Sequence, residues 1–433
     1  MIINKHHKYL ISFIFLCFVI AANFAWFNPN PDYKVYKTTE TIPFFWQYND
    51  DAAVEIVTSA YFPKIFHTYK TRMERPTYPI ISKALGEVFG FVFTPVKKLS
   101  KLEKAGAGYV ILKLIIFSLF AFSSYHLLKC YLPEDYSLFT VFLLLTHEFS
   151  LTSFSLFHTS ELQFITPTIV TFFYVNLINK YSNIKNIFFS IIVGILILAK
   201  SNYAIYLGIL IFSLFNKKFF EVLLSFISHT FPIIIYFFYL KLAGFEFFSR
   251  SQELGMGSWI FNSNIVSINT FIELIFLSVF KFLLNFIQHF HVFIIFSILG
   301  FFFIDPKKRK SILIFLIILI FFTWFQVFFA NRYRSYYSSD LSIFIFGLSS
   351  LYFFKFFEKL NLKKNILKFI SIIWLTLNLV FILNLPYVHP KDQPTRSKNV
   401  QQQRIHMIEN FELYDKKLIE RNKDGQLLYP ENK

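Results

Sequence analysis

Long apolar segments, bounded by short polar ones, recur along the whole chain, and their lengths match the thickness of a lipid bilayer. A window of about 19 residues predicts membrane-spanning helices in this pattern. The predicted spans are eleven, at 9–27, 107–128, 136–152, 162–179, 186–199, 203–215, 219–240, 286–304, 311–330, 340–357 and 366–385. The two segments beside Lys200 are short, which leaves open a single bent unit. The pattern therefore predicts an all-α polytopic membrane protein with about eleven transmembrane helices and a long loop after the first.

The composition excludes soluble classes of protein. Of the 433 residues 55% are hydrophobic, 21% are aromatic and only 16% are charged, whereas a soluble domain carries about 25% charged residues. Cys17 and Cys130 lie in or beside apolar segments, so we expect both to be buried small hydrophobes, with no disulfide framework and no zinc site.

The distribution of basic residues predicts the orientation. With the N-terminus in the cytoplasm, the inner segments hold sixteen Lys and Arg residues and the short outer segments hold five, as the positive-inside rule requires. Most of the net charge of +17 then reflects topology, and no nucleic-acid partner is expected. We interpret the first span as an uncleaved signal anchor in the plasma (inner) membrane; a cleaved signal peptide with a weak site near Ala21 is the alternative.

Two regions follow from this topology. Residues 1–385 form a transmembrane domain whose first outer loop spans 28–105. Residues 386–433 form a polar tail that is expected outside, either as one amphipathic helix or as a disordered segment.

The first outer loop contains an acidic pair directly ahead of a segment with helical periodicity. Asp50 and Asp51 could simply accept backbone N–H bonds in the first turn of that helix. A carboxylate at the membrane surface can also act as a general base or ligate a divalent cation. Position along the chain does not separate these roles.

Two arginines in the same loop come just before prolines that fix an extended turn. Arg72 and Arg75 precede Pro76 and Pro79. Arginine presents a planar fork of donors suited to phosphate; non-specific binding of lipid head groups is the alternative. The helix predicted at 79–93 is too short and polar to span, so we expect it to lie in the membrane interface.

Other predicted outer ends carry polar side chains as well. Lys200 would cost about 2.5–3.5 kcal/mol at the bilayer centre, so it should reach a water-filled cavity or a phosphate. Glu161 opens the fourth span and could be only a helix cap. The further candidates precede the tenth span: Arg332, Tyr333 and Arg334. All of these residues share the predicted outer face with the acidic pair.

His147, Glu148 and His158 lie near the predicted outer ends of the third and fourth spans, where a metal could be considered. His147 is adjacent to Glu148, so the two side chains point in different directions on a helix, and metal ligation by this group is not expected. His289 and His291 also diverge, and we interpret them as satisfied polar positions in an aromatic belt.

Five short motifs together resemble the GT-C superfamily of integral-membrane glycosyltransferases, the class of the aminoarabinose transferase acting on lipid A and the protein O-mannosyltransferases. They lie between residue 1 and about 357. The most specific is Arg75-Pro76-Thr77-Tyr78-Pro79 after an acidic loop. The others are Asp50-Asp51, Ser160-Glu161, Leu198-Ala199-Lys200 and Arg332-Tyr333.

The resemblance implies a sugar donor carried on a polyprenyl phosphate and an acidic residue of the first loop as base or metal ligand. By resemblance that residue is Asp50 or Asp51; the family often has Glu as the second member, so which aspartate is the base stays open. An inverting transfer needs a base at the acceptor and cations at the leaving phosphate, for which Arg75, Lys200 and Arg332 are candidates. The expected partners are the donor, membrane lipid and a glycan, lipid or protein acceptor; a divalent cation is a possible cofactor.

Two other classes of function remain open. A lipid or polysaccharide transporter would show ionisable residues within its spans or helices broken at symmetric positions, and the only such residues apparent are Glu273 and Lys281, which we assign to an interfacial helix at 268–285. A non-catalytic scaffold is the third possibility.

Overall fold

The structure, a computed structural model, describes most of the chain. It describes residues 5–27, 50–67, 73–92, 99, 101–155, 162–200, 219–247, 268–330, 339–360, 365–384, 420–421 and 427–428. The predicted span 203–215 and nearly all of the tail lie outside these residues.

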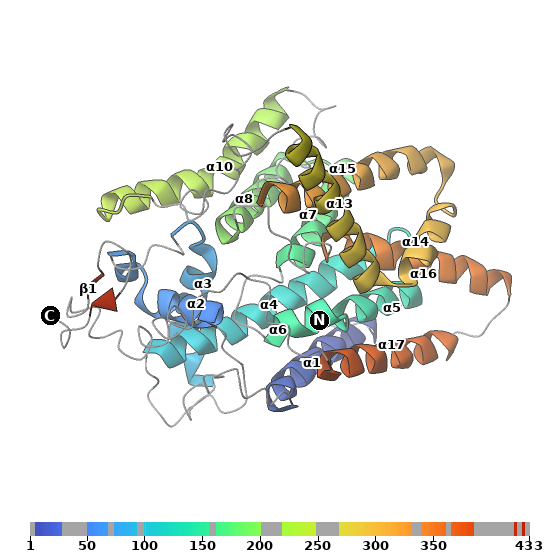
Figure 1. Cartoon of the computed structure of the whole chain (residues 1–433), viewed down its shortest axis with the longest axis horizontal. Helices are drawn as coiled ribbons and strands as arrows, with labels where there is room; N and C mark the ends of the chain where they lie inside the picture. Colours follow the sequence, from blue (N-terminus) through green and yellow to red (C-terminus); the bar gives the residue numbers. More distant parts are fainter. Residues whose placement is uncertain are drawn as a thin grey trace.

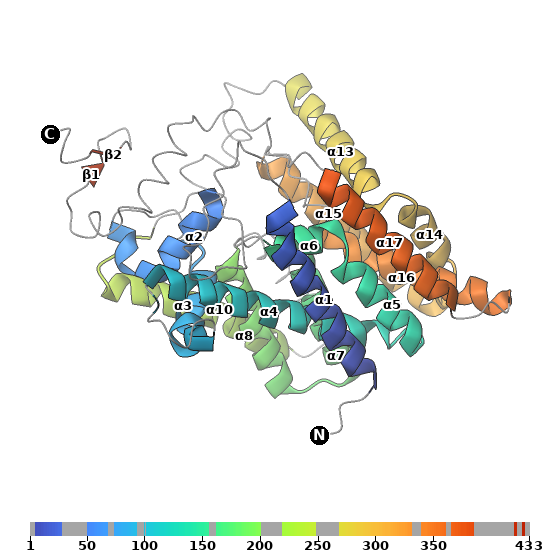
Figure 2. The ribbon, with the colours of Figure 1, turned by 90° about the horizontal axis from the view of Figure 1, so that it is seen from below.

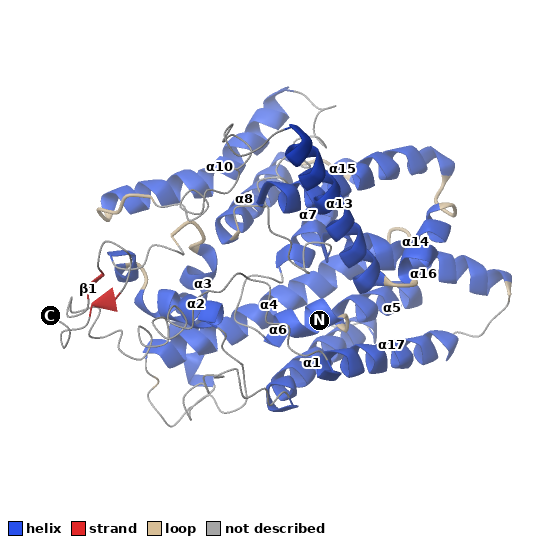
Figure 3. Cartoon of the chain, viewed as in Figure 1, coloured by secondary structure: helices blue, strands red, loops and turns tan. Residues whose placement is uncertain are grey.

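The described residues are almost entirely helical (Figure 3). The α-helices are α1 (Lys5–Phe27), α2 (Asp50–Tyr61), α3 (Thr77–Phe89), α4 (Lys101–Leu128), α5 (Glu134–Leu145), α6 (Glu148–Ser155), α7 (Leu162–Asn179), α8 (Asn183–Ala199), α10 (Phe219–Leu242), α13 (Ile268–Phe290), α14 (Phe293–Phe301), α15 (Pro306–Ala330), α16 (Ser342–Lys359) and α17 (Asn365–Asn384). Two short 3₁₀ turns, Lys64–His67 and Gly90–Val92, follow α2 and α3. In the tail, β1 (Glu420–Arg421) and β2 (Leu427–Leu428) pair antiparallel.

Several of these helices have the length and apolar composition needed to cross a membrane. Within the described residues four qualify outright: Glu103–Leu128, Phe219–Leu242, Ile268–Phe290 and Ser339–Lys359. Shorter apolar helices occur at His6–Ile20, Phe164–Leu177, Asn183–Ala199, Ile312–Phe325 and Asn365–Val380. The protein is thus an all-α membrane protein, as the hydropathy pattern predicts; the count of eleven spans stays a prediction.

Two predicted spans are broken in the structure. The segment 136–152 divides into α5 and α6 because the backbone N–H of Phe149 donates to Nδ1 of His147 at 3.2 Å, which caps the first turn of α6. The segment 286–304 divides at His291, whose φ of 43° lies in the left-handed region. The helix before that break, α13, is longer than the predicted interfacial helix 268–285.

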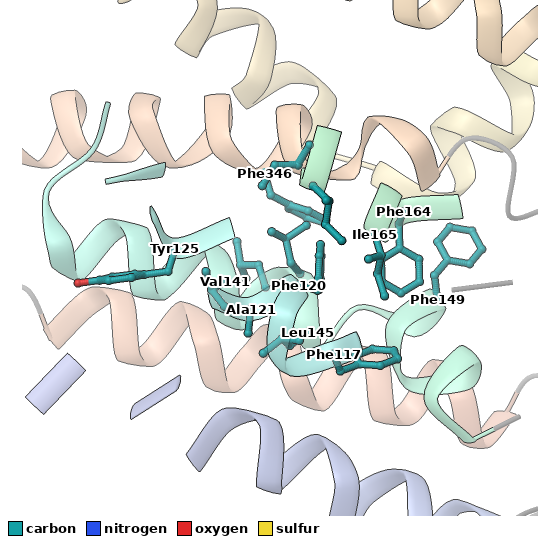
Figure 4. Close-up of a cluster of buried hydrophobic side chains, with 14 of the residues drawn as sticks. Phe117, Phe120, Ala121, Tyr125, Val141, Leu145, Phe149, Phe164, Ile165 and Phe346 are labelled. Atoms are coloured by element: carbon teal, nitrogen blue, oxygen red, sulfur yellow. The ribbon is translucent and has the colours of Figure 1, made fainter. Parts of the chain in front are cut away.

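The core of the bundle forms around α4, which runs through its middle (Figure 1). Phe117 and Phe120 of this helix are fully buried, and the rings of Phe117 and Phe154 meet edge to face with centroids 4.3 Å apart. Figure 4 shows these α4 side chains gathered with Phe164 and Phe346, which come from α7 and α16. One apolar cluster therefore joins helices from both halves of the chain.

Helix α3 lies against the first turns of α4 with their backbones in close contact. A Cβ atom at Gly86 would lie 1.9 Å from the carbonyl oxygen of Lys104, and one at Gly108 would lie 1.7 Å from that of Ser82. Real side chains do not approach this closely, so only glycine fits either position. Helix α3 is therefore packed directly onto α4; its position in the membrane interface stays a prediction.

Helices α8 and α10 run parallel, side by side. Asn186 Nδ2 donates to the carbonyl oxygen of Glu221 at 3.0 Å, and the hydroxyls of Ser190 and Ser225 are 2.9 Å apart. Both pairs have the same spacing along the chain, which only a parallel arrangement produces.

The two ends of the bundle can be told apart by contacts. At the end where the chain begins, Nδ1 of His6 lies 3.1 Å from a carboxylate oxygen of Glu134, and the ring of His7 lies 6.2 Å from that of His126. This end, where α1 and α5 begin and α4 ends, is called the N-terminal end below (Figure 2). Cys130 lies here and is exposed, so the expectation that both cysteines are buried is wrong for it; Cys17 is buried as expected.

Candidate functional site

The acidic pair stands at the very start of a helix. Helix α2 begins at Asp50 itself, so both aspartates belong to its first turn; their side chains lie outside the description. One turn further on, Glu55 is fully buried, and its Oε2 accepts a 3.1 Å hydrogen bond from the hydroxyl of Tyr109 in α4. A buried carboxylate thus ties the helix that starts with the acidic pair to the central helix.

A second bond network joins α2 to α3. The hydroxyl of Ser59 donates to the carbonyl oxygen of Pro79 at 3.0 Å and lies 2.6 Å from the hydroxyl of Ser82. Both serines are fully buried. The acidic pair and the proline-rich segment are therefore parts of one rigid unit, held on α4 by the glycine contacts described above.

The segment before α3 places Arg75 and Tyr78. Arg75 is half-buried, and its guanidinium lies 3.5 Å from a carboxylate oxygen of Glu74. Tyr78 is buried in the first turn of α3, with its ring centroid 6.3 Å from that of Tyr109. The hydroxyl of Tyr236 in α10 donates to the carbonyl oxygen of Met73 at 2.7 Å, so α10 fixes the start of this segment.

Helix α8 brings the predicted lysine to the same region. The hydroxyl of Thr77 donates to the carbonyl oxygen of Ile195 at 3.0 Å, which joins the start of α3 to the last turns of α8. Lys200 directly follows α8 and is 4% exposed. Arg75, Tyr78 and Lys200 are thus carried by segments that touch.

Helix α3 also carries a lysine whose amine is partly dehydrated. Nζ of Lys83 donates to the carbonyl oxygen of Phe62 at 2.8 Å. Burial lowers the pKa of Lys83, the charge of Lys101 lowers it further, and Glu87 opposes both. Glu87 in turn pairs with Lys104 of α4, in a partly exposed contact.

One buried cation near this region was not recognised in the sequence as a site residue. Lys113 of α4 is fully buried, and its Nζ donates to the carbonyl oxygen of Ser153 at 2.9 Å. Ser153 is in the last turn of α6, where carbonyl groups have no partner within the helix and the macrodipole is negative. Lys113 therefore closes the end of α6; a lysine inside an apolar span is the signal that marks it.

A second buried polar group lies at the two helix breaks. The carboxylate of Glu148, in the first turn of α6, contacts Nδ1 of His289 near the end of α13, and both side chains are about one-tenth exposed. The backbone N–H of Glu148 donates to the side-chain oxygen of Asn378 in α17 at 3.0 Å. His289 is satisfied, as expected, but by an ion pair between distant helices.

These residues change the comparison with a transporter. Glu273 and Lys281, the expected intramembrane candidates, are exposed on α13, while Lys113 and Glu148 are buried and the side chain of His289 is about one-tenth exposed. The expectation that Glu273 and Lys281 are the only ionisable residues that could indicate a transporter is therefore wrong. The breaks at His147 and His291 face each other through the Glu148–His289 pair.

The remaining predicted site residues lie outside the described residues. They are Arg72, Glu161, Arg332, Tyr333 and Arg334. Within the described part of the chain, no group of three or more His, Cys, Asp or Glu residues is arranged to hold a metal ion.

Comparisons with known proteins find similarity at the level of structure. No protein-family model matches the chain, and no curated protein matches it significantly. A crystal structure of the Archaeoglobus fulgidus oligosaccharyltransferase tethered by a disulfide bond to an acceptor peptide with the NVT sequon matches with a TM-score of 0.44 and 12% identity, over 87% of this chain and 54% of that one.

A second crystal structure of the same enzyme, in complex with zinc and sulfate, matches with a TM-score of 0.43 and 13% identity, over 87% of this chain and 52% of that one. The chain spans about half the length of the solved structures it matches.

Proposed function

We propose that this membrane protein is a glycosyltransferase that moves a sugar from a polyprenyl-phosphate carrier to an acceptor at the outer face of the plasma membrane. The acceptor is a glycan, a lipid or a protein. In this proposal residues 1–385 form the catalytic membrane domain with a cytoplasmic N-terminus, and the tail 386–433 lies outside. The motifs shared with the GT-C superfamily support it.

The single observation that carries the proposal is the hydrogen bond from Thr77 to Ile195. It joins the Arg75-Pro76-Thr77-Tyr78-Pro79 segment to the end of α8, where Lys200 lies. Because α3 is also bonded to α2, which begins with the acidic pair, one packed unit carries carboxylates and cations together. This is the combination that transfer from a phosphate carrier requires.

The proposed reaction is an inverting displacement. The nucleophile of the acceptor attacks the anomeric carbon and transfers its proton to the carboxylate of Asp50 or Asp51. The bond between the sugar and the carrier phosphate breaks, and the charge that develops on the phosphate is stabilised by Arg75, Lys200 and Arg332. Arg72, Tyr78, Glu161, Tyr333 and Arg334 are proposed to bind the substrates.

The test uses the purified full chain in lipid vesicles. Polyprenyl-phosphate sugars extracted from membranes should be consumed, with release of polyprenyl phosphate and appearance of the sugar on an acceptor. Nucleotide sugars offered without a lipid carrier should not be used. Transfer directly from a nucleotide sugar, or no cleavage of any lipid-linked donor, would refute the proposal.

A transporter or flippase is the second candidate, favoured by the buried Lys113 and the Glu148–His289 pair. The same vesicles separate the two functions. A flippase would move the lipid-linked sugar between leaflets and leave the glycosidic bond intact, whereas a transferase breaks it. Mass spectrometry of the recovered lipid reads out the difference.

A further inference from the structure

A cleft of about 360 Å³ lies between α4 and α7 at the N-terminal end of the bundle, far along α4 from the acidic pair. It is lined by His126, Leu127, Cys130, Phe172, Val175 and Asn176. None of these residues belongs to the proposed catalytic region. The cleft thus belongs to a different part of the surface.

The lining of the cleft combines apolar side chains with polar ones. Helix α7 runs toward this end, so Asn176 stands one turn nearer the end than Phe172, and its side-chain amide donates to the carbonyl oxygen of Phe172 at 2.8 Å. On the α4 side, His126 and Cys130 stand beside Leu127. An occupant must therefore be amphipathic, with its apolar part toward Phe172 and Val175.

The rim of the cleft is basic. The ring of His7 lies 6.2 Å from that of His126, Lys129 follows α4, and Lys180 is exposed directly after α7. The carboxylate of Glu134 contacts Lys129, which raises the pKa of Lys129 and lowers that of Glu134. The positive charge of Lys129 is thereby partly compensated by Glu134. Lys180, which is exposed one turn after Asn176, then carries the remaining positive charge at the rim.

We propose that this cleft binds an anionic phospholipid, with one acyl chain along Phe172 and Val175 and the head-group phosphate at Lys180 and His126. A membrane supplies such a molecule at high local concentration, and basic clefts between spanning helices attract anionic head groups. The apolar side chains of Leu127, Phe172 and Val175 favour an amphipathic occupant over a soluble phosphate compound. This proposal does not depend on the glycosyltransferase activity.

The chain provides its own probe of occupancy. Cys130 lines the cleft and is exposed, whereas the only other cysteine, Cys17, is buried. A maleimide reagent applied to the full chain in nanodiscs should label Cys130 several-fold more slowly when phosphatidylglycerol is mixed into phosphatidylcholine. An unchanged rate would overturn the proposal.

A control variant distinguishes lipid bound in the cleft from a general effect of the anionic membrane surface on the rate of thiol labelling. Tyr131 is adjacent, is 50% exposed and does not line the cleft. In a Cys130→Ser chain, Tyr131→Cys should be labelled at nearly the same rate in both lipid mixtures. Equal slowing at both positions would show a general surface effect and overturn the proposal.

A matched pair of variants tests the head-group contact. Lys180→Gln should restore fast labelling of Cys130 in phosphatidylglycerol, because the charge beside the rim is removed. Lys185→Gln, a change of the same kind in α8 away from the cleft, should leave the slowing intact. If both variants behave alike, Lys180 does not hold the head group and the proposed site is wrong; gel filtration checks that both are folded.

Discussion

Hydrogen bonds between segments far apart in the chain are prominent among helices α2 to α10, and aromatic ring contacts are prominent among α13 to α17. In the first region Thr77 bonds Ile195, and Tyr236 bonds Met73. In the second, the ring of Phe293 lies 4.9 Å from that of Trp374 and 5.1 Å from that of Phe346, both edge to face. Both kinds of contact occur in both regions, since Trp324 of α15 donates to the hydroxyl of Ser278 in α13 and Phe117 of α4 meets Phe154 of α6 edge to face, but their balance differs.

The difference has a physical consequence for the position of the site. Between helices in a membrane, apolar packing has little solvent-driven advantage, and directional hydrogen bonds and close backbone contacts set the register. Aromatic rings tolerate small rearrangements, while a bond from a hydroxyl to a carbonyl does not. The candidate site lies among helices whose register is set by such bonds and by the close contacts at Gly86 and Gly108.

The largest effect is expected where backbones touch. Gly108→Ala places a methyl group 1.7 Å from the carbonyl oxygen of Ser82, and we expect a loss of about 3 kcal/mol or more because neither backbone can yield. Gly347→Ala is the matched control, since its nearest neighbour is a flexible Leu128 side-chain atom at 3.1 Å. Equal thermal stability of the two variants in detergent would contradict the close packing of α3 on α4.

Next in size is the ion pair that links the two regions. Glu148→Gln leaves Nδ1 of His289 without its carboxylate partner in a largely buried position, which should cost about 2 kcal/mol. The double variant Glu148→Gln/His289→Gln should recover part of that loss. Chemical denaturation in mixed micelles measures both; additive losses would mean that the pair contributes no coupling.

A smaller effect is expected from the bond between α2 and α4. Glu55→Gln and Tyr109→Phe should each lower stability by about 1 kcal/mol and reduce the transfer rate several-fold, with little change in KM for the donor, because α2 loses its fixed position. Ser12→Ala removes a bond made only within α1 and serves as the control. A rate unchanged by either change would show that Glu55 does not position α2.

The smallest effect is expected at the junction of α3 and α8. Thr77→Val keeps the shape and removes the bond to Ile195, which should cost about 0.6 kcal/mol and raise the KM for the donor. The hydroxyl of Thr230 bonds only carbonyls of its own helix, so Thr230→Val should leave the KM unchanged. A donor titration of both variants decides whether this junction shapes the site.

The helical bundle could be predicted because bilayer thickness dictates helix length. The predicted spans 9–27, 186–199, 219–240, 311–330 and 366–385 each coincide with a helix of the structure. The break at His147 could not be predicted, because it depends on a side-chain bond to the backbone two residues away. A hydropathy window averages over such a contact.

The site could be predicted only in part. Lys200 and the Arg75 segment are polar residues at the ends of apolar runs, a pattern visible in the sequence. The roles of Glu55 and Lys113 depend on partners 54 and 40 residues away, so local pattern does not reveal them. The roles of Arg72, Glu161 and Arg332 stay predictions, because these residues lie outside the described part of the chain.

In the proposed reaction a carboxylate at the start of α2 acts as the general base. Sugar transfer by Asp50→Asn and Asp51→Asn chains, supplied with a polyprenyl-phosphate sugar, tests this role directly. We expect at least one of them to lose about 100-fold or more of the rate without lower abundance in the membrane. Asp135→Asn, at the first turn of α5, should keep the full rate. Full activity in both variants of the acidic pair would contradict the account.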